Sequence, residues 1–219
     1  KMACGDKKAT CKLAILDPEL TLTQPARVTA LTGIDALAHA LETYVTTKRT
    51  ELSMDYSRRA WELLSVNFIK VIDNPYDLEA RSAMLLGACL AGLAIENSML
   101  GAAHALANPL TAHFNIVHGQ AVACMLPHVI RFNAQSMESQ YGQLASATNA
   151  VSGDDSKALA TFITEITQHS GLATHLKPQG VNADQLPMLA ADAAQQWTAQ
   201  FNPRTVEAGD LLTLYQQAF

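Results

Sequence analysis

The stretch TGIDALAHALETYV, residues 32–45, indicates more directly than any other how this 219-residue chain folds. Its apolar side chains extend a series that begins just upstream and recurs every three or four residues, the spacing of one face of an α-helix. The members of this series are Val28, Leu31, Ile34, Leu37, Ala38, Leu41, Tyr44 and Val45. The stretch therefore predicts a helix over residues 28–45, which ends in a polar loop.

The same spacing continues along the rest of the chain. It predicts further helices over residues 52–72, 78–97, 98–110, 119–131, 138–148, 156–170, 184–198 and 206–217. We expect Pro75 to limit the helix before it, Pro109 to end another, and Pro127 to kink the one that contains it. No repeat or low-complexity linker interrupts the pattern. The prediction is one all-α domain of eight or nine helices, whose central helices carry almost no charge.

The N-terminal segment does not follow this pattern. Residues 13–16 resemble a short buried strand that is stopped by Asp17 and Pro18. A lone strand has no partner in a helical chain, and the sequence begins with Lys1 rather than Met. We therefore expect the back part of a longer protein, in which residues 1–18 end a mostly absent domain and residues 19–219 form the helical domain.

Composition favours a globular chain and limits its partners. Hydrophobic residues make up 49% of the sequence and charged residues 16%, which is typical of a domain with a substantial core. Fifteen Lys and Arg against twenty Asp and Glu give a net charge of −5, with no basic run that could neutralise a phosphate backbone. Nucleic acid is therefore not an expected partner.

Neither a membrane span nor a secretory signal is expected. The longest apolar stretches, such as residues 83–95, are interrupted by Gly87 and Gly92 and are shorter than the roughly 20 residues that cross a bilayer. The N-terminal residues lack an apolar core followed by a small-residue cleavage site. The four cysteines form no Cys-x-x-Cys pair, so we expect reduced thiols and a cytoplasmic location.

Two ionisable residues of the opening stretch share one face of its helix. Asp35 and His39 are four residues apart, so their side chains project one turn apart beside the apolar face. An unpaired carboxylate in such a place costs several kcal/mol. A shared divalent cation would remove this cost, because the carboxylate binds it ionised and the imidazole neutral. A hydrogen bond between the two side chains explains this pair equally well.

A second group of histidines lies in HALANPLTAHFNIVHG, residues 104–119. His104 stands in a run of small apolar residues, and His118 follows fourteen residues later. One Asp and three His suit Zn²⁺ or Fe²⁺, with a position left for substrate. A single histidine here is more often a satisfied core residue than a ligand, but four candidates in the two least charged parts of the chain favour a metal site. The candidates are Asp35, His39, His104 and His118.

These motifs resemble the signatures of the iron-containing, or group III, alcohol dehydrogenases. TGIDALAHALETYVT, residues 32–46, is similar to that family's Asp-x-x-x-His signature. GAAHALANPLTAHFNIVHGQAVACMLPHVIRFN, residues 101–133, is similar to its second signature, His-x-x-x-His-x-Leu-Gly followed by Pro-His-Gly and Leu-Pro-His-Val. The resemblance runs from about residue 13 to residue 219, and the closing residues 201–219 resemble the family's C-terminal end.

The resemblance implies a fold and an activity. The fold would be the multi-helix C-terminal domain of the dehydroquinate-synthase-like, iron-alcohol-dehydrogenase fold, preceded by the last strand of an α/β nucleotide-binding domain. The activity would be NAD(P)-linked interconversion of a small alcohol and its aldehyde or ketone. A metal ion, Fe²⁺ or Zn²⁺, would polarise the substrate oxygen during hydride transfer. Its ligands would be Asp35, His39, His104 and His118.

The same resemblance indicates where the cofactor would bind. No Gly-rich pyrophosphate turn occurs in this sequence, so NAD or NADP would be held mainly by the absent domain. Members of the family commonly form dimers, and a homodimer is a further expectation.

Several positions depart from the family pattern. Asn108 stands where the family usually has a second histidine that could relay the alcohol proton, and an amide cannot exchange a proton near neutral pH. His113 falls where an aromatic residue is commoner and could substitute as the titrating group. Thr111 and Val117 replace the usual Gly and Pro. Glu42 is expected to be a buried hydrogen-bonding partner rather than an acid or base.

Other functions remain open at this point. A hydroxyacid–oxoacid transhydrogenase or another reductase could use the same scaffold. A non-catalytic relative, in which Asn108 marks lost activity, would use the helical domain only as structure. A helical metal-dependent hydrolase would use the cation to activate water, but such sites commonly place His and Asp next to each other, and this chain has no His-Asp dipeptide.

Overall fold

The computed structural model describes residues 7–9 and 11–219 of the chain. In these residues it forms eight α-helices and five short 3-10 helices, and no strand. The α-helices are α1 (Ala26–Val45), α2 (Glu51–Asp73), α3 (Leu78–Glu96), α4 (Ala102–Phe114), α5 (His118–Ser146), α6 (Ser156–His169), α7 (Leu186–Ala194) and α8 (Ala208–Ala218). The 3-10 helices are η1 (Lys7–Ala9), η2 (Pro18–Thr21), η3 (Lys177–Gln179), η4 (Ala183–Gln185) and η5 (Trp197–Phe201). The predicted all-α fold is confirmed.

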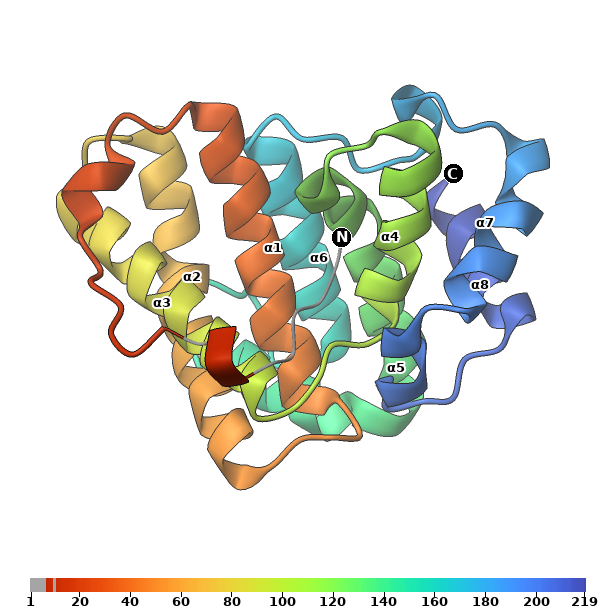
Figure 1. Cartoon of the computed structure of the whole chain (residues 1–219), viewed down its shortest axis with the longest axis horizontal. Coiled ribbons are helices and arrows are strands. Elements are labelled where there is room, and N and C mark those ends of the chain that lie inside the picture. The colour runs from red at the N-terminus through yellow and green to blue at the C-terminus, as the bar shows by residue number, and fades with distance from the viewer. Residues whose placement is uncertain (1–6, 10) are drawn as a thin grey trace.

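Helix α1 lies at the centre of the molecule. It packs against α2 and α3 and against α5, and Figure 1 shows it between the α2–α3 pair and the helices of the C-terminal half. Ile34 and Leu37 are fully buried. Because neighbours cover α1 on more than one side, apolar residues extend beyond a single face of this helix.

Side chains fix the ends of the neighbouring helices. At the start of α2, Oγ1 of Thr50 accepts a hydrogen bond from the backbone N of Ser53 at 3.1 Å, and Oγ of Ser53 accepts one from the backbone N of Thr50 at 2.8 Å. The carboxylate of Asp77 caps the first turn of α3. Helix α2 ends at Asp73, two residues before Pro75, as predicted.

Two expectations about prolines were wrong. Helix α4 does not end at Pro109 but continues to Phe114, where Asn115 adopts the left-handed conformation (φ 54°) that commonly ends a helix. Pro109 is buried, so packing outweighs its missing N–H group. The two helices expected over residues 119–131 and 138–148 both lie within α5, which is kinked between them. Its non-helical backbone angles lie at Met137 rather than at Pro127.

The buried strand expected at residues 13–16 is also not formed. These residues lie outside every helix, and the side chains of Leu13 and Ile15 are 78% and 84% exposed. A strand needs a neighbour for its backbone hydrogen bonds, and the described chain offers none. The division of the chain at residue 18 stays a prediction.

Helix α3 is the part of the described chain that bears on the expectation of no membrane span. It is long enough to cross a bilayer, and an 18-residue window of it has a mean hydropathy of 1.5, with 28% of that window buried. The glycines Gly87 and Gly92 do not interrupt the helix. It packs along α2 and α1. Length and composition alone therefore do not exclude a span here, although core helices of folded domains reach the same values.

A close helix crossing places one end of α5 beside α1. A Cβ atom on Gly119 would lie 2.1 Å from the backbone oxygen of Leu31, so this crossing requires glycine. His118 is the adjacent residue and the first of α5. The glycine therefore holds His118 next to the central helix.

Candidate metal centre

Three helices bring the four predicted ligands together. Asp35 and His39 lie one turn apart on α1, His104 lies in the first turn of α4, and His118 begins α5. Oδ1 of Asp35 lies 3.5 Å from Nε2 of His39, 3.2 Å from Nε2 of His104 and 3.5 Å from Nε2 of His118. Potential ligand atoms of the first three residues lie within 4.8 Å of one another. Side chains from distant parts of the sequence thus converge on one carboxylate oxygen.

The cluster is closed on one side and open on another. The rings of His39 and His104 are stacked with centroids 4.9 Å apart, and those of His104 and His118 are 5.2 Å apart. The His104 side chain is 3% exposed, whereas those of Asp35, His39 and His118 are about one-fifth exposed. The partly exposed side chains leave one side of the cluster in contact with solvent, which a catalytic centre requires, although Nε2 of His118 is itself buried.

Glu42 holds His104 from the buried side. Its Oε2 lies 2.5 Å from Nδ1 of His104, and its Oε1 accepts a hydrogen bond from the backbone N of Ala103 at 2.7 Å. Glu42 is 5% exposed, so the expectation of a buried hydrogen-bonding partner is confirmed. When the carboxylate accepts a hydrogen bond from Nδ1–H, the neutral ring keeps its proton on Nδ1 and presents the Nε2 lone pair to the cluster. Carboxylates commonly orient histidine ligands in this way.

The charges of the cluster favour an ionised Asp35. Burial alone would raise the pKa of this carboxyl, but the hydrogen bond with His104 and the charges of the surrounding imidazoles hold the pKa well below its usual range. For His104, burial lowers the pKa, but the carboxylates of Glu42 and Asp35 raise it overall to about 9. A proton on His104 and a divalent cation are alternatives here, because either one balances the same two carboxylates.

The donor set fits Fe²⁺ or Zn²⁺. A single carboxylate oxygen has two lone pairs, fewer than the three imidazole nitrogens that face Oδ1 of Asp35. Of the three, Nε2 of His104 lies within hydrogen-bond distance of this oxygen, at 3.2 Å, and a cation that accepts a lone pair from each of the four residues would fit the arrangement. Imidazole suits Fe²⁺ and Zn²⁺, while Mg²⁺ and Ca²⁺ prefer oxygen ligands.

The two residues expected to concern proton transfer lie farther along α4. Asn108 and His113 line a cavity of about 580 Å³ that His118 also lines. Nδ2 of Asn108 donates to Oε1 of Gln196 at 3.0 Å, and Nε2 of His113 lies 2.5 Å from Oδ2 of Asp192. The structure thus brings both residues to the side of the cluster where His118 lies, with their polar partners on α7 and just beyond it.

Asp192 and Gln196 are candidate functional residues that the sequence did not single out. They lie in the unremarkable segment ADAAQQ, 79 and 88 residues from their partners on α4. No local pattern marks them, because their proximity depends on the packing of α4 against α7. Only a correct arrangement of these helices could have revealed them.

Two known proteins are similar to this chain over nearly all of its length. The model of the Fe-containing alcohol dehydrogenase family, C-terminal, matches residues 29–219. The chain is 34% identical to a probable alcohol dehydrogenase, EutG, of Salmonella typhimurium, over 94% of this chain and 52% of that protein. It is 30% identical to an NAD-dependent methanol dehydrogenase of Bacillus methanolicus, over 100% of this chain and 58% of that protein.

A solved structure shares the helical fold. The crystal structure of a 1,3-propanediol oxidoreductase matches with a TM-score of 0.88 and 31% identity, over 93% of this chain and 55% of that one. The chain therefore spans about half the length of the relatives it matches.

Proposed function

This chain belongs to the iron-containing alcohol dehydrogenase family, and from that premise we propose that it supplies the metal-binding half of an NAD(P)-linked oxidoreductase acting on small alcohols and aldehydes or ketones. The observation that carries the proposal is the convergence of three imidazole nitrogens on one oxygen of Asp35. The relatives are a probable alcohol dehydrogenase and a methanol dehydrogenase, which supports the reaction class, and the second of them is NAD-dependent. Because the chain spans about half their length, we propose that the nucleotide is bound mainly by another half.

We assign four residues as ligands of Fe²⁺ or Zn²⁺: Asp35, His39, His104 and His118. When bound, such a cation supplies Lewis-acid chemistry, which polarises the substrate oxygen and lowers the pKa of an alcohol. The chain's own residues prepare this site. Glu42 keeps the Nε2 lone pair of His104 free, because it accepts a hydrogen bond from the protonated Nδ1 atom. The open side of the cluster admits the alcohol.

We also propose that His113 takes up the alcohol proton. Asn108 occupies the family's usual histidine position and cannot titrate near neutral pH. His113 lines the same cavity as Asn108 and His118. The carboxylate of Asp192, 2.5 Å from its Nε2, would stabilise the charged ring and orient it.

Metal content together with an alcohol panel tests the function. We expect the full-length protein to hold one Fe²⁺ or Zn²⁺ ion per chain and, with NAD⁺ or NADP⁺, to oxidise short-chain alcohols or diols. His104→Ala should lose the ion, whereas His169→Ala should keep it, because His169 is exposed and pairs with Asp73 at 2.6 Å. Stoichiometric metal in the His104→Ala protein would contradict the ligand assignment.

The same panel separates the alternatives. Metal-loaded protein that oxidises none of these alcohols would favour a non-catalytic relative. Hydride exchange between a hydroxyacid and an oxoacid without added nucleotide would instead identify a transhydrogenase. Either result would replace the alcohol dehydrogenase proposal.

A pH profile tests the role of His113. We expect His113→Gln to lower kcat about tenfold or more, in line with the loss of general acid–base help, and to remove a titration step from the kcat profile while KM changes little. Asp192→Asn should also lower kcat, because it removes the carboxylate that orients the His113 ring, whereas Asp184→Asn, on an exposed residue of η4, should leave kcat unchanged. An unchanged profile in the His113→Gln protein would mean that another group takes the proton.

A further inference from the structure

Arg81 is a buried cation outside the metal centre. It lies in the first turn of α3 and is 3% exposed. Among the described residues, no carboxylate forms an ion pair with it. A buried charge without a counter-charge is unfavourable. Burial lowers the pKa of this guanidinium, yet an arginine stays charged in proteins. The fold therefore keeps a positive charge that its own side chains do not balance.

Two hydrogen bonds hold the guanidinium of Arg81 in place, and its third nitrogen has no hydrogen-bond partner among the described residues. Nε donates to the carbonyl oxygen of Pro75 at 2.8 Å, and Nη1 donates to Oγ1 of Thr29 at 3.2 Å. Nη2 is buried and has no hydrogen-bond partner in the described part of the chain. Because the guanidinium is rigid and planar, the two existing bonds also fix the direction of the two N–H groups on Nη2.

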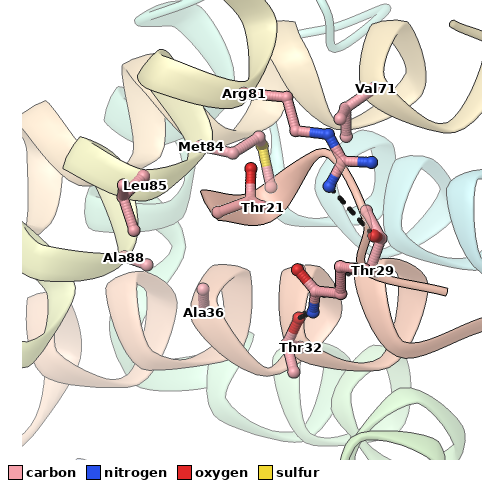
Figure 2. Close-up of a pocket in the computed structure, with 11 residues that line it drawn as sticks. Thr21, Thr29, Thr32, Ala36, Val71, Arg81, Met84, Leu85 and Ala88 are labelled. Carbon is pink, nitrogen blue, oxygen red and sulfur yellow. Dashed lines mark hydrogen bonds between the residues drawn. The ribbon is translucent and has the colours of Figure 1, made fainter. Parts of the chain in front are cut away.

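Arg81 lines a cavity of about 120 Å³ between η2, α1, α2 and α3. Figure 2 shows its side chain extending from α3 toward Thr29 on α1, with Thr21 and Met84 beside the same space. The described lining residues include no acidic side chain and none of the four metal-cluster residues. The space is large enough for about four water molecules at their liquid volume, but water would not balance the charge.

We propose that this cavity binds a small monovalent anion from solution, of the size of a halide or formate ion, between Nη2 of Arg81 and the hydroxyl group of Thr29. Oγ1 of Thr29 accepts the bond from Nη1, so its hydrogen is left to donate to the anion. One guanidinium is neutralised by one negative charge, which favours a monovalent ion over sulfate or phosphate. A volume of about 120 Å³ suits a small ion.

Crystals of the full chain soaked in sodium bromide locate the anion directly. We expect an anomalous bromide peak in contact with Nη2 of Arg81 and with Oγ1 of Thr29. Ordered water alone at this place would overturn the proposal. An aspartate or glutamate side chain bound to Nη2 would also overturn it, because the counter-charge would then belong to the protein.

Thermal unfolding tests the same site in solution. The midpoint should rise with potassium bromide or formate and then saturate, whereas potassium gluconate at equal ionic strength, whose anion is too large, should not produce that saturating rise. Thr29→Val removes one hydrogen bond to the anion and should weaken the apparent affinity about two- to tenfold. Thr164→Val, which removes a comparable hydroxyl from α6 outside the cavity, should leave the affinity unchanged.

Two outcomes of this assay would reject the site. One is identical bromide and gluconate curves for the unsubstituted chain. The other is equal bromide affinity in the Thr29→Val and Thr164→Val proteins, because the ion would then bind elsewhere. All of these proteins retain Arg81. The result is therefore not complicated by a variant that loses the hydrogen bonds of Arg81 to Pro75 and Thr29.

Discussion

Glu42 determines which nitrogen of His104 is available to a cation. As a carboxylate it has no hydrogen to donate, so it accepts two hydrogen bonds. One comes from Nδ1–H of His104 and the other from the backbone N–H of Ala103. The ring then carries its lone pair on Nε2, the atom that faces Asp35. An amide at this position has one acceptor and one donor, which cannot satisfy two N–H groups.

Replacing Glu42 by Gln is therefore expected to weaken metal binding while the fold is retained. If the amide oxygen accepts from Ala103, the amide nitrogen donates to Nδ1 of His104, and the ring proton moves to Nε2. Loss of such an orienting partner typically costs 10- to 100-fold in metal affinity. Competitive titration against a chromogenic chelator measures the change. Glu79→Gln, at an exposed residue of α3, is the matched control, and equal affinities of the two variants would contradict the tautomer argument.

His128 makes the stability of the chain depend on pH. Burial lowers its pKa from 6.5 to about 4, and the charges of Arg131 and His175 lower it as well. Arg204 and Asp210 line the same cavity. Between pH 6.5 and 4 the unfolded chain binds more protons at this residue than the folded chain, so this contribution to stability is complete above pH 6.5 and is lost as the pH falls toward 4.

We expect His128→Gln to lose less stability than the unsubstituted chain when the pH falls from 7 to 4.5. The pKa shift sets an upper limit of about 3 kcal/mol, and partial exposure of the ring reduces it. Urea unfolding at both pH values, with a chelator present, measures the difference. Gln168→Ala, at an exposed residue of α6 that carries no titratable group, should follow the unsubstituted chain. Parallel curves for His128→Gln and the unsubstituted chain would show that this ring does not titrate with folding.

At the scale of elements, sequence patterns predicted the helices better than their ends. Apolar spacing located α1, α2 and α3 closely, because each buries a face that leaves a three- to four-residue repeat. The helix end expected at Pro109 is wrong because Pro109 is buried inside α4, and Asn115, a residue type that tolerates the left-handed conformation, ends the helix instead. The spacing of residues along the sequence does not show the tertiary contacts that allow a helix to continue beyond a proline.

The crossing of α1 and α5 supplies a prediction about glycines. Gly119→Ala should destabilise the chain by about 1–3 kcal/mol or more, because its Cβ would overlap the backbone of Leu31 and the helices must separate. Gly92→Ala on α3 is the matched control: no atom lies within 4 Å of its Cβ, so alanine should stabilise by up to about 1 kcal/mol. Denaturant unfolding of both variants measures whether the free energy of unfolding falls for Gly119→Ala and rises for Gly92→Ala. Similar stabilities would mean that α5 shifts at little cost.

At the scale of the molecule, the candidate site is assembled by the whole helical fold. Residues 35, 39, 104 and 118 are predicted as one set from their types and from the family resemblance, and the structure brings them together. Their assignment as ligands stays a prediction. Asp192 and the cavity of Arg81 were missed because both depend on how distant helices pack, which spacing along the chain does not encode.

Because three helices contribute to the cluster, a bound cation should stabilise the folded chain as a whole. The unfolded chain does not hold the four side chains together, so the ion binds the native state preferentially, and a free concentration 100 times the dissociation constant adds about 2.7 kcal/mol. For a chain of this size that corresponds to a rise of about 5–10 °C in Tm. We expect this rise with Zn²⁺, or with Fe²⁺ under anaerobic conditions, and its reversal by a chelator. Mg²⁺ should have little effect, because it prefers oxygen ligands. In His104→Ala the rise with Zn²⁺ should disappear; an undiminished rise would place the stabilising ion outside the cluster of α1, α4 and α5.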